Sequence, residues 1–162
     1  VSFHSWKVGR IKELNNVDYN GLKNLGCTCY MNSLLQQLFT IPSFRESILA
    51  APDPQFKDLK LEDNVLFQLK CVFAGLINSK KGYYTPRSLC LAFKEPDGSP
   101  TNLSEQKDVF EFYSIFMDKI EDQNKKTIHE NLVKNHFGGT ISKEIICRGC
   151  PHSYEREECF LA

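Results

Sequence analysis

The chain has no surplus of either charge, because its 20 Lys and Arg residues are balanced by 20 Asp and Glu residues. A balanced chain has no overall electrostatic attraction to nucleic acid or to an anionic membrane surface. We therefore expect neither as a partner, and any charged partner must meet a local patch of the surface.

Long hydrophobic runs are missing too. No stretch approaches the roughly 18 consecutive apolar residues that a membrane-spanning helix needs, and the first residues, VSFHSWKVGR, contain no signal-peptide core. They also lack an initiating Met. We therefore expect a soluble chain that is part of a longer protein. Internal repeats and low-complexity tracts are absent from the sequence as well.

The cysteines do not form the pattern of a small disulfide scaffold. There are seven of them, an odd number, and they are scattered through segments with helical patterns. This usage favours a reducing compartment, and we expect an intracellular protein of the cytoplasm or nucleus. Cys71 and Cys90 lie among apolar residues, so we expect them to be small core side chains.

What the chain does have is enough apolar material for a folded core. Hydrophobic residues make up 41% of its 162 residues and aromatic residues 12%, with 12 Phe. That content excludes a disordered chain. The length is that of one domain, or of one domain and the start of another.

The apolar periodicity indicates helices first and strands near the end, which is an α+β class. We expect three parts: an N-terminal arm over 1–19, a helical part over 20–136, and the start of a β part over 137–162. Within the first part, Phe3, Trp6, Val8 and Ile11 are compatible with a short strand or a packed arm.

The expected helices are placed by apolar stripes and by capping residues. Pro42 closes the first expected helix, and Thr85-Pro86 opens the third. Ser104 is a candidate cap for the fourth, which has the clearest apolar stripe. Two strands joined by a knuckle follow the glycines at 138 and 139. The helices are expected at about 29–40, 62–78, 86–93, from Val109 to Ile120, and 128–135.

Cys29 is the residue best placed to be a nucleophile. It follows a loop with two glycines and falls at the first position of the helix expected at 29–40. The positive end of a helix dipole and its unpaired N–H groups favour a thiolate over a thiol. The amide of Asn24, on the same loop, could fold back over the helix start and donate a hydrogen bond to an oxyanion.

Other interpretations of this segment stay open at the level of the residues. Cys29 could be a buried cysteine at an ordinary junction between a loop and a helix. Cys27 is a rival nucleophile, although its loop position gives it less of the dipole. The Cys-x-Cys pair could also bind a metal or become oxidised.

The segment GLKNLGCTCYMNS, residues 21–33, followed by LLQQLF, resembles the Cys box that opens the catalytic domain of ubiquitin-specific proteases. The resemblance implies that Cys29 is the nucleophile and that Asn24 helps to stabilise the oxyanion. It gives Cys27 no catalytic role. It also implies the papain-like cysteine peptidase fold of thumb, palm and fingers, of which this chain supplies the helical thumb and the first finger strands, an incomplete domain.

Asp108 and Glu111 are three residues apart at the start of the clearest helix and share one of its faces. They could simply be a solvated acidic first turn that complements the helix dipole. They could also hold a basic extended peptide, because each carboxylate can accept a bidentate guanidinium.

The segment QKDVFEF, residues 106–112, is similar to the family's Gln-Gln-Asp-x-x-Glu-Phe motif, and Lys107 replaces the second Gln. The resemblance implies that Gln106, Asp108 and Glu111 bind the arginine-bearing C-terminal tail of ubiquitin. The segment from Glu105 to Asp108 is also similar to that of very large family members.

Cys147 and Cys150 have the Cys-x-x-Cys spacing of half a tetrahedral zinc site. A structural zinc could be completed by His152 and Cys159, or the two cysteines could carry no metal. The surroundings resemble the entry to the family's fingers, where a second Cys-x-x-Cys follows. We expect no cofactor for catalysis.

A cysteine protease also needs a general base. None of the histidines has the surroundings that the family uses for its base, so we expect the base and its orienting group to lie outside this chain. The four histidines are His4, His129, His136 and His152.

The resemblance as a whole implies hydrolysis of the bond after the C-terminal Gly of ubiquitin, with ubiquitin and ubiquitinated proteins as partners. A catalytically inactive ubiquitin-binding scaffold or an inactive fragment is the alternative.

Overall fold

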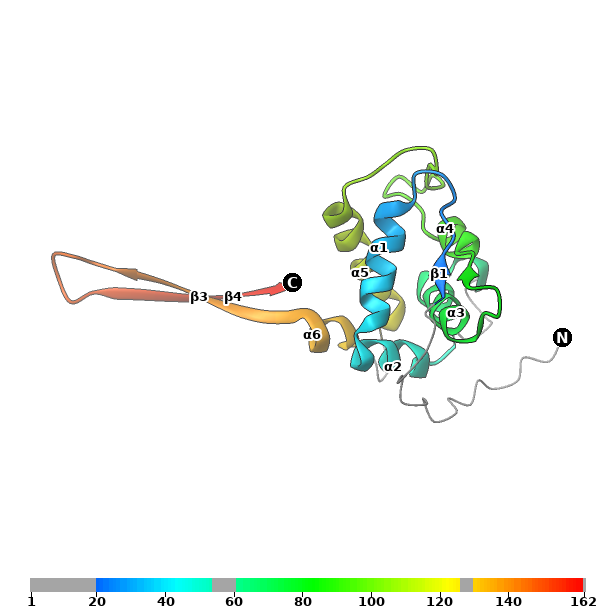
Figure 1. Cartoon of the computed structure of the whole chain (residues 1–162). Helices are drawn as coiled ribbons and strands as arrows, with labels where there is room; N and C mark the ends of the chain where they lie inside the picture. Colours follow the sequence, from blue (N-terminus) through cyan, green and yellow to red (C-terminus); the bar gives the residue numbers. More distant parts are fainter. Residues whose placement is uncertain (1–19, 54–60, 126–129, 162) are drawn as a thin grey trace.

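The structure is a computed structural model and describes residues 20–53, 61–125 and 130–161. The arm predicted over 1–19 lies outside the described residues, as do His4 and His129. In Figure 1 a body of short helices carries a long two-stranded hairpin that projects away from it. The elements are β1 (Gly21–Leu22), α1 (Cys29–Thr40), α2 (Pro42–Ala50), the 3-10 helix η1 (Leu61–Asp63), α3 (Val65–Asn78), β2 (Tyr83–Tyr84), α4 (Arg87–Ala92), α5 (Val109–Asn124), α6 (Leu132–Phe137), β3 (Gly138–Ile146) and β4 (Ser153–Leu161).

The helices predicted from the apolar stripes are present, with shifted boundaries. The first has the expected bounds, 29–40. Pro42, however, also opens α2, a helix that the sequence analysis did not predict, because proline fits the first turn of a helix as well as the end of one. The cap predicted at Ser104 is wrong: Asp108 is the N-cap of α5, and its carboxylate accepts from the N–H groups of Phe110 and Glu111.

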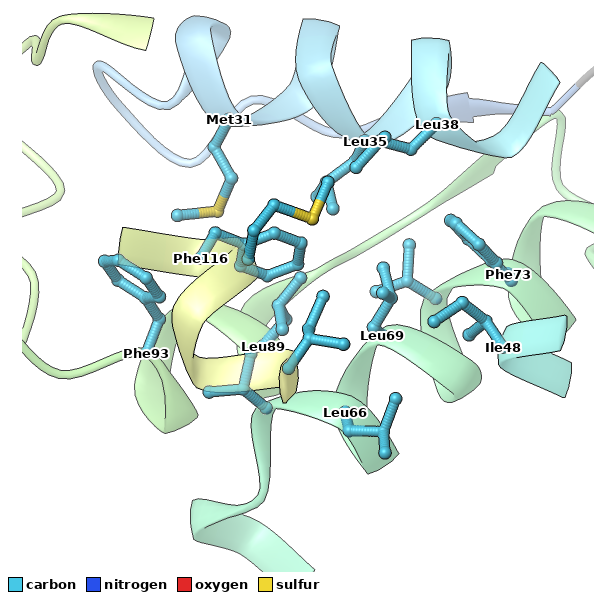
Figure 2. Packing of buried hydrophobic residues seen from close by; sticks show 14 of the residues in the cluster. Met31, Leu35, Leu38, Ile48, Leu66, Leu69, Phe73, Leu89, Phe93 and Phe116 are labelled. Carbon is cyan, nitrogen blue, oxygen red and sulfur yellow. The ribbon is translucent and has the colours of Figure 1, made fainter. Parts of the chain in front are cut away.

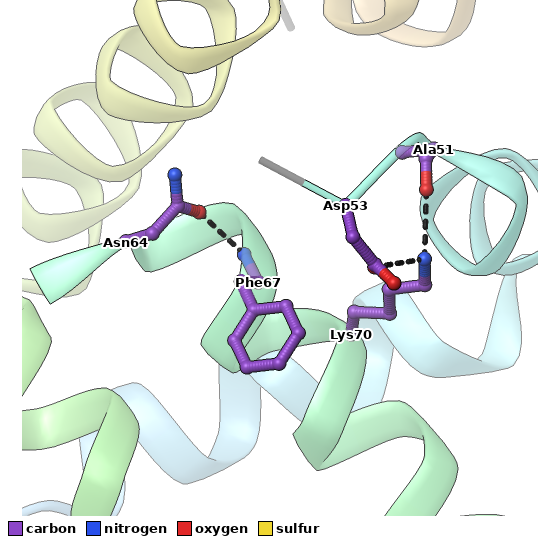
Figure 3. A network of polar contacts seen from close by, with 5 residues as sticks. All are labelled: Ala51, Asp53, Asn64, Phe67 and Lys70. Carbon is purple, nitrogen blue, oxygen red and sulfur yellow. Dashed lines mark hydrogen bonds and ion pairs between the residues drawn. The ribbon is translucent and has the colours of Figure 1, made fainter. Parts of the chain in front are cut away.

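Side-chain contacts cap α3 and join it to the end of α2. Asn64 caps α3 by accepting a hydrogen bond of 2.7 Å from the N–H of Phe67, as Figure 3 shows. Lys70 donates to the carbonyl of Ala51, one of the carbonyls that the end of α2 leaves unpaired, and forms an ion pair with Asp53. The chain therefore leaves α2 in a fixed direction.

The core lies between α1, α2, α3, α4, α5 and α6. Figure 2 shows Met31 and Leu35 of α1 pointing toward Phe116 of α5 and Leu69 of α3. Each of these four side chains is fully buried. Cys90 is buried, as predicted, and its thiol lies 3.6 Å from the sulfur of Met31. Cys71 is only half-buried. Burial raises the pKa of both thiols, that of Cys90 to about 11, so neither is activated.

Two small sheets complete the described part of the chain. β1 and β2 form a short parallel pair that anchors the segment leading into α1. β3 and β4 form the antiparallel hairpin, in register from Gly138 opposite Leu161 to Ile146 opposite Ser153. The two strands and the knuckle predicted after the glycines are therefore confirmed. No helix in the described ranges combines the length and the apolarity that crossing a bilayer requires.

The packing of the core predicts that alanine substitutions of two phenylalanines of α5 differ strongly in their effect on the free energy of unfolding. Phe116 is 0% exposed and Phe110 is 71% exposed. We expect Phe116→Ala to lower the free energy of unfolding by about 3–5 kcal/mol through lost burial and a cavity. Phe110→Ala, the matched control, should change it by less than about 0.5 kcal/mol. Chemical denaturation measures both values, and equal effects would contradict this packing.

Candidate active site

Cys29 is the first residue of α1, and its side chain is exposed. The alternative of a buried cysteine at an ordinary junction is therefore wrong. Cys27 is half-buried in the loop, and its N–H donates to the carbonyl of Leu103 at 2.7 Å. Of the two cysteines, Cys29 is the one that an incoming substrate can reach more freely.

The loop before α1 is held by its own polar side chains. The side-chain oxygen of Asn24 accepts from the N–H groups of Gly26 and Thr28, each at 3.2 Å, and from the hydroxyl of Thr28 at 2.9 Å. The hydroxyl of Thr28 in turn accepts from the N–H of Leu25. Since the oxygen of the Asn24 amide is fully used, its NH₂ group is oriented, and it donates to no group in the described ranges.

The first N–H groups of α1 are not used in hydrogen bonds within the described residues. Thr28 is the N-cap, but its side chain turns back to the loop and makes no capping hydrogen bond. The first N–H bonded within this turn is that of Asn32, which donates to the carbonyl of Thr28. Within the described residues, the N–H groups of Cys29, Tyr30 and Met31 therefore have no acceptor. Such donors at a helix start can bind an anionic oxygen.

The acidic pair lies at the start of α5. Asp108 uses one carboxylate oxygen, Oδ1, as the helix cap, at 2.7 Å from the N–H of Phe110 and 3.0 Å from the N–H of Glu111. Asp108 is therefore the N-cap of α5, and Glu111 is the acidic residue of its first turn. Its second oxygen and the carboxylate of Glu111 accept no hydrogen bond in the described part of the chain. Gln106, Asp108 and Glu111 are all exposed.

The two helix starts lie side by side. The rings of Tyr30 and Phe112 meet edge to face, with centroids 5.3 Å apart. Tyr30 follows Cys29 in the chain, and Phe112 follows Glu111. Figure 1 accordingly shows α1 and α5 beginning at the same end of the helical body. The structure thus brings Cys29 and the acidic pair to one end of the helical body.

The contact between the Cys box and the loop that leads into α5 was not predicted from the sequence. Residues 94–107 cross from α4 to α5 beside the Cys box, and a Cβ on Gly26, whose φ is +139°, would lie 2.3 Å from the carbonyl oxygen of Leu103. Only glycine fits this approach. Gly26 itself indicated a close approach by another part of the chain, but nothing in the sequence indicated that this part is Leu103.

The same loop carries Glu95, which the sequence analysis also missed. The hydroxyl of Tyr30 is buried without a hydrogen-bond partner among the described residues. Burial raises the pKa of Tyr30 to about 12, and the nearby Glu95 carboxylate adds to this effect. Tyr30 therefore stays protonated and is no candidate for a base at neutral pH.

The histidines in the described ranges lie away from Cys29. Both ring nitrogens of His136 meet hydroxyls of α2, Nε2 at 3.1 Å from Ser47 and Nδ1 at 3.4 Å from Ser43. Because α2 begins just after α1 ends, His136 lies near the end of α1 that is opposite to Cys29, and α1 itself is about 16 Å long. His152 lies at the far end of the hairpin. Neither residue is in place to take a proton from Cys29.

Cys147 and Cys150 are exposed in the turn at the tip of the hairpin. The N–H of Gly149, and then the groups of Cys150, hydrogen-bond to the Cys147 sulfur and lower its pKa, which suits a thiolate ligand. The closed site with His152 and Cys159 is wrong: Cys159 pairs with Thr140, about 20 Å down the strand from the turn. No group of three or more metal-binding side chains occurs in the described part of the chain.

The sequence of this chain is similar to one family of known proteins. The family model described as "Ubiquitin carboxyl-terminal hydrolase" matches residues 20–155. "Ubiquitin carboxyl-terminal hydrolase 24" of Mus musculus is 39% identical over 142 residues, which is 88% of this chain and 5% of the relative. "Ubiquitin carboxyl-terminal hydrolase 9Y" of Homo sapiens is 36% identical over 86% of this chain and 7% of the relative.

A relative from an insect is similar in the same way. "Ubiquitin carboxyl-terminal hydrolase puf" of Drosophila melanogaster is 36% identical over 88% of this chain, which corresponds to 4% of that protein. The chain thus spans about one-twentieth of the length of the relatives that it matches. The matched part contains both the Cys29 end of α1 and the acidic start of α5, and the chain belongs to the ubiquitin carboxyl-terminal hydrolase family.

Proposed function

We propose that this chain is part of a cysteine-type deubiquitinase, which hydrolyses the isopeptide or peptide bond after the C-terminal Gly of ubiquitin. Its partners are then ubiquitin and ubiquitinated proteins. The observation that carries the proposal is that the exposed thiol of Cys29 shares one end of the body with the carboxylates of Asp108 and Glu111. A protein that only binds ubiquitin has no need of a thiol at this position.

In the proposed reaction the thiolate of Cys29 attacks the carbonyl carbon of the terminal Gly. The oxyanion that forms is held by the NH₂ group of Asn24 and by the free N–H groups at the start of α1. The amine leaves as it gains a proton, and water then hydrolyses the thioester. These donors are already oriented before substrate binds, since Asn24 is fixed through its oxygen by Thr28.

The proton transfers need a general base from outside the described residues, because His136 and His152 lie at other places in the fold. Substrate positioning is assigned to Gln106, Asp108 and Glu111, which are exposed at the start of α5. The carboxylates would bind the basic side chains of the tail through charge-assisted hydrogen bonds.

The finer fold belongs to the same proposal. The helical body is proposed to be the thumb of a papain-like peptidase, and the β3–β4 hairpin the first strands of its fingers. A structural zinc would be held by Cys147 and Cys150 together with two further ligands. The cell compartment proposed is the cytoplasm or the nucleus.

Labelling with a ubiquitin that carries a thiol-reactive C-terminal group tests the nucleophile. In the full-length protein we expect labelling to be lost in Cys29→Ala and kept in Cys27→Ala, because only Cys29 adjoins the free N–H groups of α1. Mass spectrometry identifies the modified residue. Binding without any labelling would instead support the inactive scaffold, and labelling of Cys27 would overturn the assignment.

Removing the charge of the acidic pair tests substrate positioning. Asp108→Asn keeps a good helix cap and Glu111→Gln keeps the side-chain shape. Each should raise KM for a ubiquitin substrate by about tenfold or more, since hydrogen bonds to charged groups are worth about 1.5–3 kcal/mol. Steady-state kinetics should show little change in kcat.

Asp118→Asn is the matched control for this pair, because Asp118 is exposed on the same helix but lies two turns beyond its start. Its KM should equal that of the wild type. Unchanged KM in both Asp108→Asn and Glu111→Gln would remove the acidic pair from the proposed site.

The zinc proposal has its own test, which does not depend on activity. Elemental analysis of the purified full-length protein should find less bound zinc in the double variant Cys147→Ser/Cys150→Ser than in the wild type, because two of the four ligands of the proposed site are lost. Labelling of Cys29 by the ubiquitin probe should persist. Equal zinc content in the two proteins would show that the hairpin tip holds no zinc.

A further inference from the structure

Lys107 forms the most buried ion pair in the described part of the chain. Its ammonium lies 2.5 Å from Oε1 of Glu95, and the two side chains are 24% and 17% exposed. Every other ion pair in the described ranges has a partner that is at least 43% exposed. The contact is an ion pair without the alignment of a hydrogen bond, so its strength is electrostatic.

The loop that this pair closes is short and is also held by hydrogen bonds of its backbone and side chains. The N–H of Glu95 donates to the carbonyl of Ser99 at 2.9 Å, and the hydroxyl of Thr101 donates to the carbonyl of Phe93 at 2.7 Å. These contacts fix the loop as far as Thr101. The ion pair adds a contact between the end of the loop, at Lys107, and its start, at Glu95.

The same loop touches the other end of the site. The carbonyl of Leu103 accepts the N–H of Cys27 at 2.7 Å, and Glu95 lies close enough to Tyr30 to influence its titration. The loop therefore lies against Cys27 and Tyr30, the residues on either side of Thr28 and Cys29. Its end, at Lys107, is directly joined to the acidic pair.

From this arrangement we propose that Lys107 and Glu95 are a positioning pair, which sets the distance and direction between the thiol of Cys29 and the carboxylates of Asp108 and Glu111. The inference rests on the proposed function and deepens it. A neutral Gln, which the family motif has at the position of Lys107, cannot form this ion pair. The alignment of nucleophile and tail-binding acids in this chain thus depends on a charge interaction.

The test is a double-mutant cycle in the full-length protein with Lys107→Met, Glu95→Gln and the double variant. Each single variant should slow labelling by the thiol-reactive ubiquitin about threefold to tenfold, which lies in the lower part of the range of coupling between residues in contact. In the Glu95→Gln background, Lys107→Met should cause no further loss. Lys107→Arg should restore the rate, because it keeps the charge.

Alkylation of Cys29 by iodoacetamide separates positioning from simple loss of structure. This small probe does not reach the acidic pair, so its rate should be unchanged in all variants, whereas a disordered loop would change it. Lys125→Met, which removes an exposed ion pair with Asp122 at the other end of α5, is the matched control and should leave both rates unchanged.

Amide hydrogen exchange over residues 24–29 provides a readout that needs no ubiquitin. We expect the N–H of Cys27, which is bonded to Leu103, to exchange at least about threefold faster in Lys107→Met and in Glu95→Gln, and at the wild-type rate in Lys125→Met. Unchanged exchange, or independent effects of the two substitutions, overturns the positioning pair. Absence of any Cys29 labelling in the wild type overturns the proposed function instead, and the exchange rates still decide the pair.

Discussion

The edge-to-face packing of Tyr30 on Phe112 is the contact on which the rest of the site depends. It joins the starts of two helices that are about 80 residues apart in the sequence, so that their free N–H groups and carboxylates meet at one end of the body. Each ring is almost fully buried. The buried side supplies the stability, and the residue before each ring, Cys29 or Glu111, is exposed. The first turns of α1 and α5 thus contribute both to the core, through the two rings, and to the site, through Cys29 and Glu111.

Local signals predicted the parts of this site well. The loop with two glycines and the apolar stripe of α1 placed Cys29 at a helix start, and the stripe of α5 placed Asp108 and Glu111 at the start of that helix. These features depend on neighbouring residues and on helical period alone. The resemblance to a known Cys box added the roles that spacing could not supply. The predicted cap at Ser104 failed because the stretch between it and Asp108 could be capped at either residue.

The relations between the parts could not be predicted in the same way. The approach of Gly26 to Leu103 and the ion pair of Lys107 with Glu95 join residues whose neighbours in sequence give no sign of each other. Both contacts arise from tertiary packing of a loop without periodicity. The zinc alternative that included Cys159 failed for a related reason, since the register of a hairpin decides which cysteines meet and spacing in the sequence does not.

The central claim is that one substrate tail reaches Cys29 and the acidic start of α5 at the same time. A crystal structure of the full-length protein joined covalently to ubiquitin through its C-terminal group tests this directly. We expect a bond from Sγ of Cys29 to the terminal Gly, an oxyanion or its analogue near the NH₂ of Asn24, and arginine side chains of the tail on Asp108 and Glu111. A tail bonded to Cys29 but directed away from α5, or bonded to Cys27, would contradict it.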